Sequence, residues 1–194
     1  MALPFTEHQR CTIRQKLFES AQRHAVSDGV QKTSLDTLTS EAGISKSSFY
    51  KFYESKEQLF VEVALSWETE VIGAGMRSLA ASKNSCDKER AAAFVYRVFE
   101  RIHQMGITRF LKEDLPYLNA ALPKDTARTH CLSSARSILN TLHQEKIHFT
   151  APDEIVLSVI QLMYLSILNI GDIGENYFTA LHTLVQSACE KLVA

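Results

Sequence analysis

The stretch Gly43-Ile-Ser-Lys-Ser-Ser-Phe-Tyr-Lys-Phe-Tyr-Glu-Ser-Lys56 decides the fold, because it holds the end of one helix and the starts of two more. Gly43 follows an apolar run with helical spacing and suits the left-handed position that closes a helix. Ser45 suits the N-cap of the next helix, and Ser55 with Gln58 forms the pattern of a capping box. The stretch therefore predicts a helix, a tight turn and a second helix, followed at once by a third.

The second of these helices has one face that suits a protein core and one that suits a partner. Ile44 and Phe49 are placed to point back into a core. The outer face is then small, polar and cationic, and it consists of Lys46, Ser47, Ser48, Tyr50 and Lys51. Such a face suits the major groove of DNA, where side chains can reach base edges. Lys56 adds a cation beside the free backbone amides of the following helix, which favours a phosphate contact.

A recognisable order of residues runs through this region. It consists of Thr33 and Ser34, then Gly43-Ile44-Ser45-Lys46, Phe49-Tyr50, Phe52-Tyr53, Ser55-Lys56-Glu57 and Leu59. This order resembles the DNA-binding domain of the TetR family of transcriptional repressors. We therefore expect DNA contacts from Thr33, Ser34, Ser45, Lys46, Ser47, Ser48, Tyr50, Lys51 and Lys56. Ser47 stands where the family often has glycine, alanine or proline, so the resemblance implies no particular operator sequence.

The composition limits the classes of protein to which the chain can belong. With 194 residues, 45% of them hydrophobic and 22% charged, it can form a globular fold with a real core. The formal net charge of -1 argues against a protein that coats nucleic acid without sequence preference. Between Ala42 and Tyr53, however, there are two lysines and no acidic residue, so positive charge is concentrated on the helix pair.

Cysteine and histidine positions predict neither a metal nor another cofactor. The cysteines Cys11, Cys86, Cys131 and Cys189 are scattered, without the paired spacing of a zinc site or a redox dithiol. The seven histidines form no paired ligand motif either. We expect a reducing, cytoplasmic setting, because the N-terminus carries no export signal. An aliphatic stretch at residues 155–170 is interrupted by polar residues and is shorter than the roughly 20 residues that a bilayer requires, so we expect no membrane span.

Apolar periodicity predicts an all-α protein of about nine helices, since no segment alternates like a strand. Residues 1–55 should form a three-helix DNA-binding head with the helix-turn-helix, and residues 56–194 a helical effector-binding and dimerisation domain. The first helix should begin at a capping box at Thr6 and end near Asp28, and the fourth should run from Lys56 to about Met76. Later helices are expected near residues 92–102, 107–111, 123–146, 153–170 and 175–193, with a turn at 115–118 and a capping sequence from Thr150.

The last two predicted helices carry more apolar surface than one core contact requires, which suggests a partner surface. The expected dimer interface consists of Val159, Met163, Tyr177, Leu181, Leu184, Val185 and Ala188. In a two-fold dimer these helices would form a four-helix bundle, which is also what the family resemblance implies. The alternative is that both helices are consumed by the core of a single chain.

The family resemblance implies a pocket for a small effector among the middle helices. Its expected lining consists of Trp67, Phe99, His103, Phe110, Tyr117, Cys131 and Met163, with His103 and Tyr117 as the polar contacts. Aromatic residues and methionine at helical spacing also suit plain core, so sequence leaves both readings open. A thiol sensor built on Cys131 or Cys86 is a further alternative.

These observations favour one function over two others. We expect a ligand-responsive, homodimeric transcriptional regulator: a repressor that binds an inverted repeat in double-stranded DNA and is released by a small, largely apolar effector. An enzyme is disfavoured because the chain shows no nucleophile motif, phosphate loop, metal-binding helix or dinucleotide fingerprint. A helical adaptor that binds only protein is the second alternative, and the lysines of the outer face would then be incidental.

Overall fold

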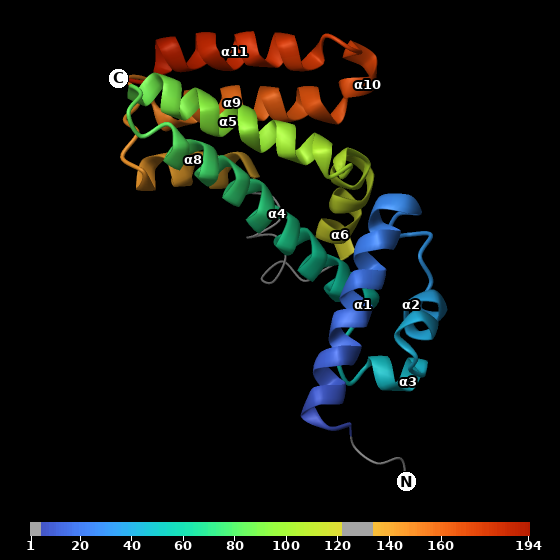
Figure 1. Ribbon diagram of the computed structural model, residues 1–194. Coiled ribbons are helices and arrows are strands. Elements are labelled where there is room, and N and C mark those ends of the chain that lie inside the picture. Colours follow the sequence, from blue (N-terminus) through green and yellow to red (C-terminus); the bar gives the residue numbers. More distant parts are fainter. Residues whose placement is uncertain (1–4, 122–133) are drawn as a thin grey trace. The chain divides into compact units, whose positions relative to one another are not determined.

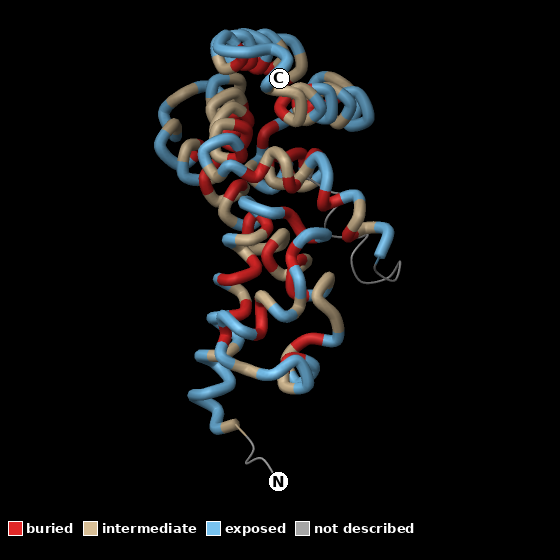
Figure 2. Tube along the Cα trace, turned by 90° about the vertical axis from the view of Figure 1, so that its right-hand side faces the viewer, coloured by how far each residue is buried: buried red, intermediate tan, exposed pale blue. Residues whose placement is uncertain are grey.

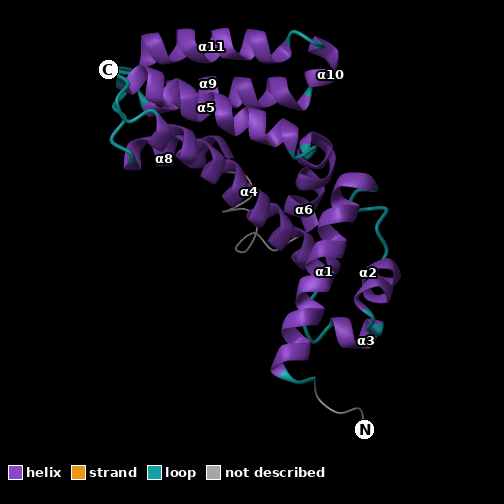
Figure 3. Ribbon diagram, viewed as in Figure 1, coloured by secondary structure: helices purple, strands orange, loops and turns teal. Residues whose placement is uncertain are grey.

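The computed structural model describes residues 5–121 and 134–194, and every regular element within them is a helix (Figures 1 and 3). The helices are α1 (Glu7–Ser27), α2 (Leu35–Ala42), α3 (Lys46–Phe49), α4 (Lys56–Ala81), α5 (Asp87–Gln104), the π-helical turn η1 (Phe110–Asp114), α6 (Leu115–Ala121), α8 (Ser134–Gln144), α9 (Asp153–Leu168), α10 (Ile170–Ile173) and α11 (Tyr177–Leu192). The all-α prediction is confirmed over these ranges. The predicted start at Pro123 lies outside the described residues, and α8 covers the part of the predicted range from Ser134 to Gln144.

Contacts divide the chain into two compact units. The first unit comprises residues 1–66 and 109–132, and the second comprises residues 67–108 and 133–194. The first unit thus includes a segment that lies far from the head in sequence. The domain boundary that we expect after residue 55 stays a prediction, because a compact unit of contacts is not the same as a domain that folds alone.

In the first unit α1 begins as the sequence predicts. The Thr6 hydroxyl accepts a hydrogen bond from the Gln9 amide at 3.3 Å, and the Gln9 side chain accepts one from the Thr6 amide at 2.9 Å. The buried face of α1 carries Leu17, Ser20, Ala21 and Ala25. This face packs on α2, whose own buried side chains are Leu38, Thr39 and Ala42. Figure 2 shows buried and exposed positions alternating along the helical tube.

The segment after α5 corrects the sequence prediction. A short helix at residues 107–111 and a turn at 115–118 were expected, but residues 110–121 are helical throughout. The Leu115 amide bonds the carbonyl of Phe110, five residues back, so the backbone widens into a π-helical turn immediately before Pro116. A proline cannot donate to the ladder and its ring crowds the preceding turn. The wider turn before Pro116 lets the helix continue without that clash.

In the second unit α5 packs along α11, and close approach of α4 to α5 depends on a glycine. A Cβ added at Gly75 would lie 2.8 Å from a ring carbon of Phe94 and 2.9 Å from a methyl of Val98. Glycine is therefore required where α4 crosses α5. α4 also continues to Ala81, beyond its predicted end at Met76, because Arg77, Leu79, Ala80 and Ala81 are good helix formers.

The start of α9 also differs from the prediction. Pro152 occupies the N-cap and makes no side-chain cap bond. Thr150 does not cap α9; its hydroxyl instead bonds the carbonyls of Lys191 and Leu192, both at 3.2 Å. The Thr150 side chain thus ties the loop before α9 to the end of α11. The predicted end near Gly171 falls inside the short helix α10, since α9 itself ends at Leu168.

Candidate nucleic-acid interface

The helix-turn-helix is fixed by three local caps. Ser34 caps α2 by accepting from the Thr37 amide at 3.0 Å. Gly43 ends α2 in the left-handed conformation, with φ 72°, and Ser45 accepts from the Ser48 amide at 3.3 Å to start α3. α3 is a single turn of four residues. The predicted order of helix, tight turn and helix is therefore present, with a shorter second helix than the sequence suggested.

Two aromatic residues hold α3 in place. Phe49 is fully buried and Tyr53 is 4% exposed, and their stacked rings have centroids 5.7 Å apart. The Arg14 guanidinium lies 5.5 Å from the centre of the Tyr53 ring and forms an ion pair with Glu62 at 2.9 Å. Burial raises the pKa of Tyr53 to about 12, so its hydroxyl is neutral at physiological pH. α3 thus rests on a packed aromatic pair.

The outer face of α3 has the composition that the sequence predicts. Lys46, Ser47, Tyr50 and Lys51 are exposed, with Tyr50 at 60%, and Ser48 is partly exposed. The exposed hydroxyl of Ser45 lies 3.0 Å from that of Ser47. The face is therefore small, hydroxyl-rich and cationic, which suits contacts with both phosphates and base edges.

Two predicted contact residues have other partners. Thr33 is 3% exposed, and its hydroxyl donates to the Gly29 carbonyl at 2.7 Å, so Ser34 and not Thr33 is the exposed cap. The Lys56 ammonium donates to the carbonyls of Val30 and Thr33, both at 2.8 Å. This arrangement gives Lys56 a structural role in the loop between α1 and α2, and its phosphate contact stays a prediction.

The outer face of α3 includes an ion pair with an acidic residue, Asp36, that the sequence analysis did not assign to it. The Lys46 ammonium lies 2.8 Å from a carboxylate oxygen of Asp36, and the two side chains are 54% and 73% exposed. Asp36 lies in the first turn of α2, upstream of the acid-free stretch between Ala42 and Tyr53. The signal that could have found it is the hairpin itself, which brings the start of α2 beside the start of α3.

Aromatic and cationic side chains also gather next to the outer face of α3. The Phe5 and Phe52 rings have centroids 5.9 Å apart, and the Lys51 ammonium lies 5.5 Å from the centre of the Phe5 ring. The Arg10 guanidinium lies 5.5 Å from the centre of the Phe52 ring. Arg10 therefore adds a cation from the start of α1. The sequence prediction missed it because more than 30 residues separate Arg10 from α3.

A histidine network joins α1 to α2. The His24 Nδ1 lies 2.6 Å from a carboxylate oxygen of Asp28, and its Nε2 lies 2.9 Å from one of Glu41. The other Glu41 oxygen accepts from Ser20 and from Arg23, both at 2.7 Å. Carboxylates only accept hydrogen bonds, so both ring nitrogens of His24 must carry protons to satisfy this arrangement. The hydrogen bond to Glu41, and next the one to Asp28, raises the pKa of His24.

A clamp from η1 and its flank holds the end of α1. The Arg109 guanidinium donates to the carbonyls of Ala25, Val26 and Asp28 at 3.3, 3.0 and 3.2 Å. Asp114, which is 3% exposed, accepts from the Val30 amide at 3.0 Å. These bonds occupy the carbonyls that the end of a helix leaves unpaired. The loop that leads into α2 is thereby fixed from a distant part of the sequence.

The predicted effector-pocket residues have varied environments. In the second unit Trp67, Phe99 and Met163 are buried, while His103 is exposed and packs on Phe178 with ring centroids 5.0 Å apart. Met163 lines an apolar cavity of about 30 Å³, which has room for about one water molecule. In the first unit Phe110 is buried and the Tyr117 hydroxyl donates to Glu57 at 3.0 Å. Cys131 lies outside the described residues, and Cys86 is exposed at the start of α5.

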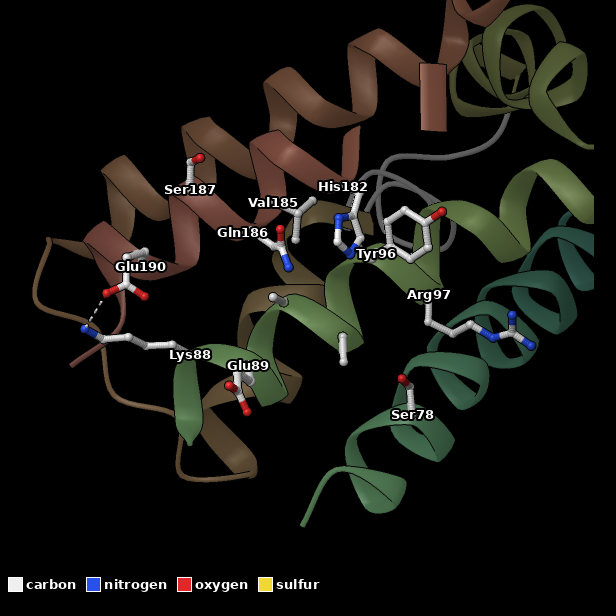
Figure 4. A pocket seen from close by; sticks show the side chains of 12 residues that line it. Ser78, Lys88, Glu89, Tyr96, Arg97, His182, Val185, Gln186, Ser187 and Glu190 are labelled. Carbon is white, nitrogen blue, oxygen red and sulfur yellow. Dashed lines mark ion pairs between the residues drawn. The ribbon is translucent and has the colours of Figure 1, made fainter. Parts of the chain in front are cut away.

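A larger groove lies between α5 and α11, and Ser78 of α4 also lines it (Figure 4). Its volume is about 690 Å³, which is in the range of small-molecule sites. The Lys88–Glu190 ion pair, at 3.6 Å, lies toward one end. Toward the other end, the Tyr96 and His182 rings meet edge to face with centroids 5.2 Å apart. The groove is thus lined by charged, aromatic and aliphatic side chains together.

The predicted dimer residues divide into two groups. Met163, Tyr177, Leu181 and Val185 are at most 8% exposed and pack inside the second unit, so they do not form part of the surface. Leu184 is 58% exposed, and Val159 and Ala188 are partly exposed. The exposed apolar residues that the prediction missed are Ile155, Leu162 and Leu165 on α9, at 51%, 66% and 55%. Exposed apolar residues therefore occur on both α9 and α11, and the dimer interface itself stays a prediction.

Comparison with known proteins finds a family match for part of the chain. Residues 17–63 match the family model described as bacterial regulatory proteins, tetR family. No curated protein matches the chain in sequence. None of the described helices is both long and apolar enough to cross a membrane.

Several solved structures share the fold. A TetR family transcription regulator from Marinobacter aquaeolei VT8 is 18% identical, with 97% of this chain and 99% of that chain covered and a TM-score of 0.62. A putative tetR family regulator from Shewanella sp. PV-4 is 17% identical, with coverages of 94% and 98% and a TM-score of 0.62. The transcriptional regulator FadR from Bacillus subtilis, solved in complex with stearoyl-CoA, is 12% identical, with coverages of 90% and 96% and a TM-score of 0.67.

Proposed function

We propose that the chain is a ligand-responsive repressor of the TetR type that binds operator DNA as a homodimer, because residues 17–63 match the tetR family model and the fold resembles that of TetR family regulators. The observation that carries this proposal is the outer face of α3. Its hydroxyls and lysines are exposed, while caps at both ends of the turn and the buried Phe49 fix their positions. A surface fixed in this way can enter a major groove without first becoming ordered.

The contacts on this face divide into two roles. Tyr50 and Lys51 are proposed to bind phosphates and so to set the position of the head on the duplex. Lys46 and Ser48, at the start of α3, are proposed to contact base edges. Loss of a phosphate contact should weaken binding to all sequences, whereas loss of a base contact should change the preferred sequence.

Dimerisation is proposed to occur through the exposed apolar stripe of α9 and α11. The stripe consists of Ile155, Leu162 and Leu165 with Leu184. Exposed apolar residues that gather on adjacent helices are typical of protein interfaces. A two-fold dimer presents two heads, so the operator should be an inverted repeat whose half-sites lie about one helical turn, roughly 34 Å, apart.

The effector is proposed to bind in the groove between α5 and α11. The FadR structure from Bacillus subtilis contains stearoyl-CoA, which has an apolar chain and a charged head group. The groove likewise combines the Tyr96 and His182 rings with the charges of Lys88, Arg97 and Glu190. We therefore propose an effector that carries polar groups, in place of the largely apolar effector expected from sequence, since the apolar cavity beside Met163 measures only about 30 Å³.

The test is a gel-shift titration with the DNA that flanks the protein's own gene, followed by selection from a random duplex library. Retention of duplexes that contain an inverted repeat is the expected result. The Lys51→Ala variant should bind the selected duplex more weakly while its circular dichroism spectrum is unchanged. If the folded protein enriches no duplex, the proposal is wrong and the helical adaptor becomes the better interpretation.

A further inference from the structure

The ion pair between Asp36 and Lys46 lies on the face that we propose for DNA binding. It joins the first turn of α2 to the first residue of α3, with 2.8 Å between the ammonium and a carboxylate oxygen. Both side chains remain more than half exposed. A carboxylate on such a face is unexpected, because it is repelled by the phosphates of DNA.

The one other charged residue of α2 has a different role from Asp36. Glu41, at the far end of α2, binds Ser20, Arg23 and His24 of α1 and so belongs to the packing of the head. Asp36 instead forms its ion pair with Lys46, the first residue of α3. Its negative charge therefore acts on the outer face and not on the core.

The pair has two consequences for Lys46. First, the carboxylate neutralises an ammonium that could otherwise bind any phosphate, which lowers affinity for DNA of arbitrary sequence. Second, it restrains a long, flexible side chain near the start of α3, where base contacts are expected in this type of head. A lysine so placed can donate to the O6 and N7 acceptors of guanine, and a carboxylate can accept from the N4 amino group of cytosine.

We propose that Asp36 is a specificity-determining residue for DNA binding: with Lys46 it selects a G·C pair, and it suppresses binding to phosphates of other sequences. This inference rests on the proposed function as a DNA-binding regulator. Guanine O6 and cytosine N4 lie side by side in the major groove of one G·C pair, so an ammonium and a carboxylate that are already adjacent match that pair.

The test compares the full-length protein with Asp36→Asn, which keeps the size of the side chain and removes its charge. Glu19→Gln is the matched control, because it changes the net charge equally but alters an exposed side chain that bonds Gln15 on its own helix. Each protein is used to select duplexes from a random library. Dissociation constants are then measured for the duplex selected by the unmodified protein and for a random-sequence duplex, between about 50 and 200 mM salt.

The expected result has three parts. Asp36→Asn should bind the random duplex more tightly, with a salt dependence steeper by about one unit of slope. Its ratio of specific to random affinity should fall by about fivefold or more, the factor that corresponds to one lost base contact. Its selected sequences should lose a G·C preference at one position in each half-site, while Glu19→Gln keeps the preference.

Three results would overturn the inference. If Asp36→Asn keeps both the affinity ratio and the selected sequence of the unmodified protein, Asp36 has no role in specificity although DNA binding itself stands. If the unmodified protein enriches no duplex at all, the proposed function fails and this inference fails with it. A Lys46→Met protein that retains the same G·C preference would also contradict the inference, since the carboxylate is proposed to act together with that lysine.

Discussion

The His24 network predicts that stability of the first unit depends on pH. His24 is bonded to Asp28 and Glu41, and only the doubly protonated ring can donate to both. The bond to Glu41, followed by the bond to Asp28, raises the pKa of His24 above the ordinary value of 6.5. The stabilisation is therefore fully present below pH 6.5 and is lost as pH rises through the higher folded-state pKa.

The size of the effect follows from the bonds involved. Deprotonation leaves one ring nitrogen as an acceptor that faces a carboxylate, so one charge-assisted hydrogen bond is lost. Such a bond contributes about 1.5–3 kcal/mol when sheltered, and exposed ion pairs contribute about 0.2–1 kcal/mol. The His24 side chain is 19% exposed, which favours an intermediate value of about 1 kcal/mol. For a chain of this length that corresponds to about 2–4 °C in melting temperature.

The assay is thermal unfolding followed by circular dichroism between pH 6 and 9 for three proteins. His24→Gln removes the network, and His8→Gln is the control because His8 is an exposed histidine at the other end of α1. The unmodified protein should exceed His24→Gln in melting temperature by most at pH 6, and the difference should shrink toward pH 9. His8→Gln should follow the unmodified protein throughout. Parallel curves for the unmodified protein and His24→Gln would refute the assignment of a protonated His24.

Further predictions concern the dimer, the DNA contacts and the loop before α2. Leu162→Glu should give a folded monomer in sedimentation, whereas Leu181→Glu should unfold the protomer, because Leu181 is 2% exposed. A dimer that survives Leu162→Glu would exclude the exposed residues of α9 as the dimer interface. Lys51→Ala should flatten the salt dependence of DNA binding by about one unit, and an unchanged slope would remove its phosphate contact. Lys56→Met should lower the unfolding free energy by about 1–3 kcal/mol in denaturant titrations, because the carbonyls of Val30 and Thr33 lose their donor. A variant with lower DNA affinity and unchanged stability would contradict the structural role of Lys56. Gly29→Ala should lower the unfolding free energy by at least about 1–2 kcal/mol in the same titrations, since φ at Gly29 is 91° and the added Cβ would lie 2.9 Å from a guanidinium nitrogen of Arg109. Unchanged stability would show that the loop can rearrange.

Features that depend on a few consecutive residues could be predicted from the sequence. The capping box at Thr6, the left-handed Gly43 and the cap at Ser45 are each determined by residues within one helical turn, and each is present. The all-α fold follows from the same kind of signal, repeated along the chain. The continuous helix across Pro116 contradicted a strong local signal, because the π-helical turn relieves the clash that normally ends a helix at proline.

Features that depend on pairing between distant residues could not be predicted. Asp36 and Lys46 lie on different helices, and the Glu41 partner of His24 lies 17 residues away. Periodicity located the surplus apolar surface on α9 and α11, but it could not tell Leu162, which is exposed, from Met163, which is buried, since both suit a broad apolar face. The site residues with the clearest electrostatic roles were therefore the least visible in the sequence.

The clamp on the end of α1 has a consequence for the order in which this protein can fold during synthesis. The Val30 amide can form its hydrogen bond only after Asp114 has been synthesised, 84 residues later. The Ala25 carbonyl likewise needs Arg109, which follows it by the same number of residues. At a translation rate of about 5–20 residues per second, this interval lasts roughly 4–17 s. By the end of that interval α1, α2 and α3 have all been synthesised, but the loop between α1 and α2 still lacks its anchors. A nascent chain arrested before residue 109 should accordingly be cut by protease in this loop, and a chain released after residue 121 should resist.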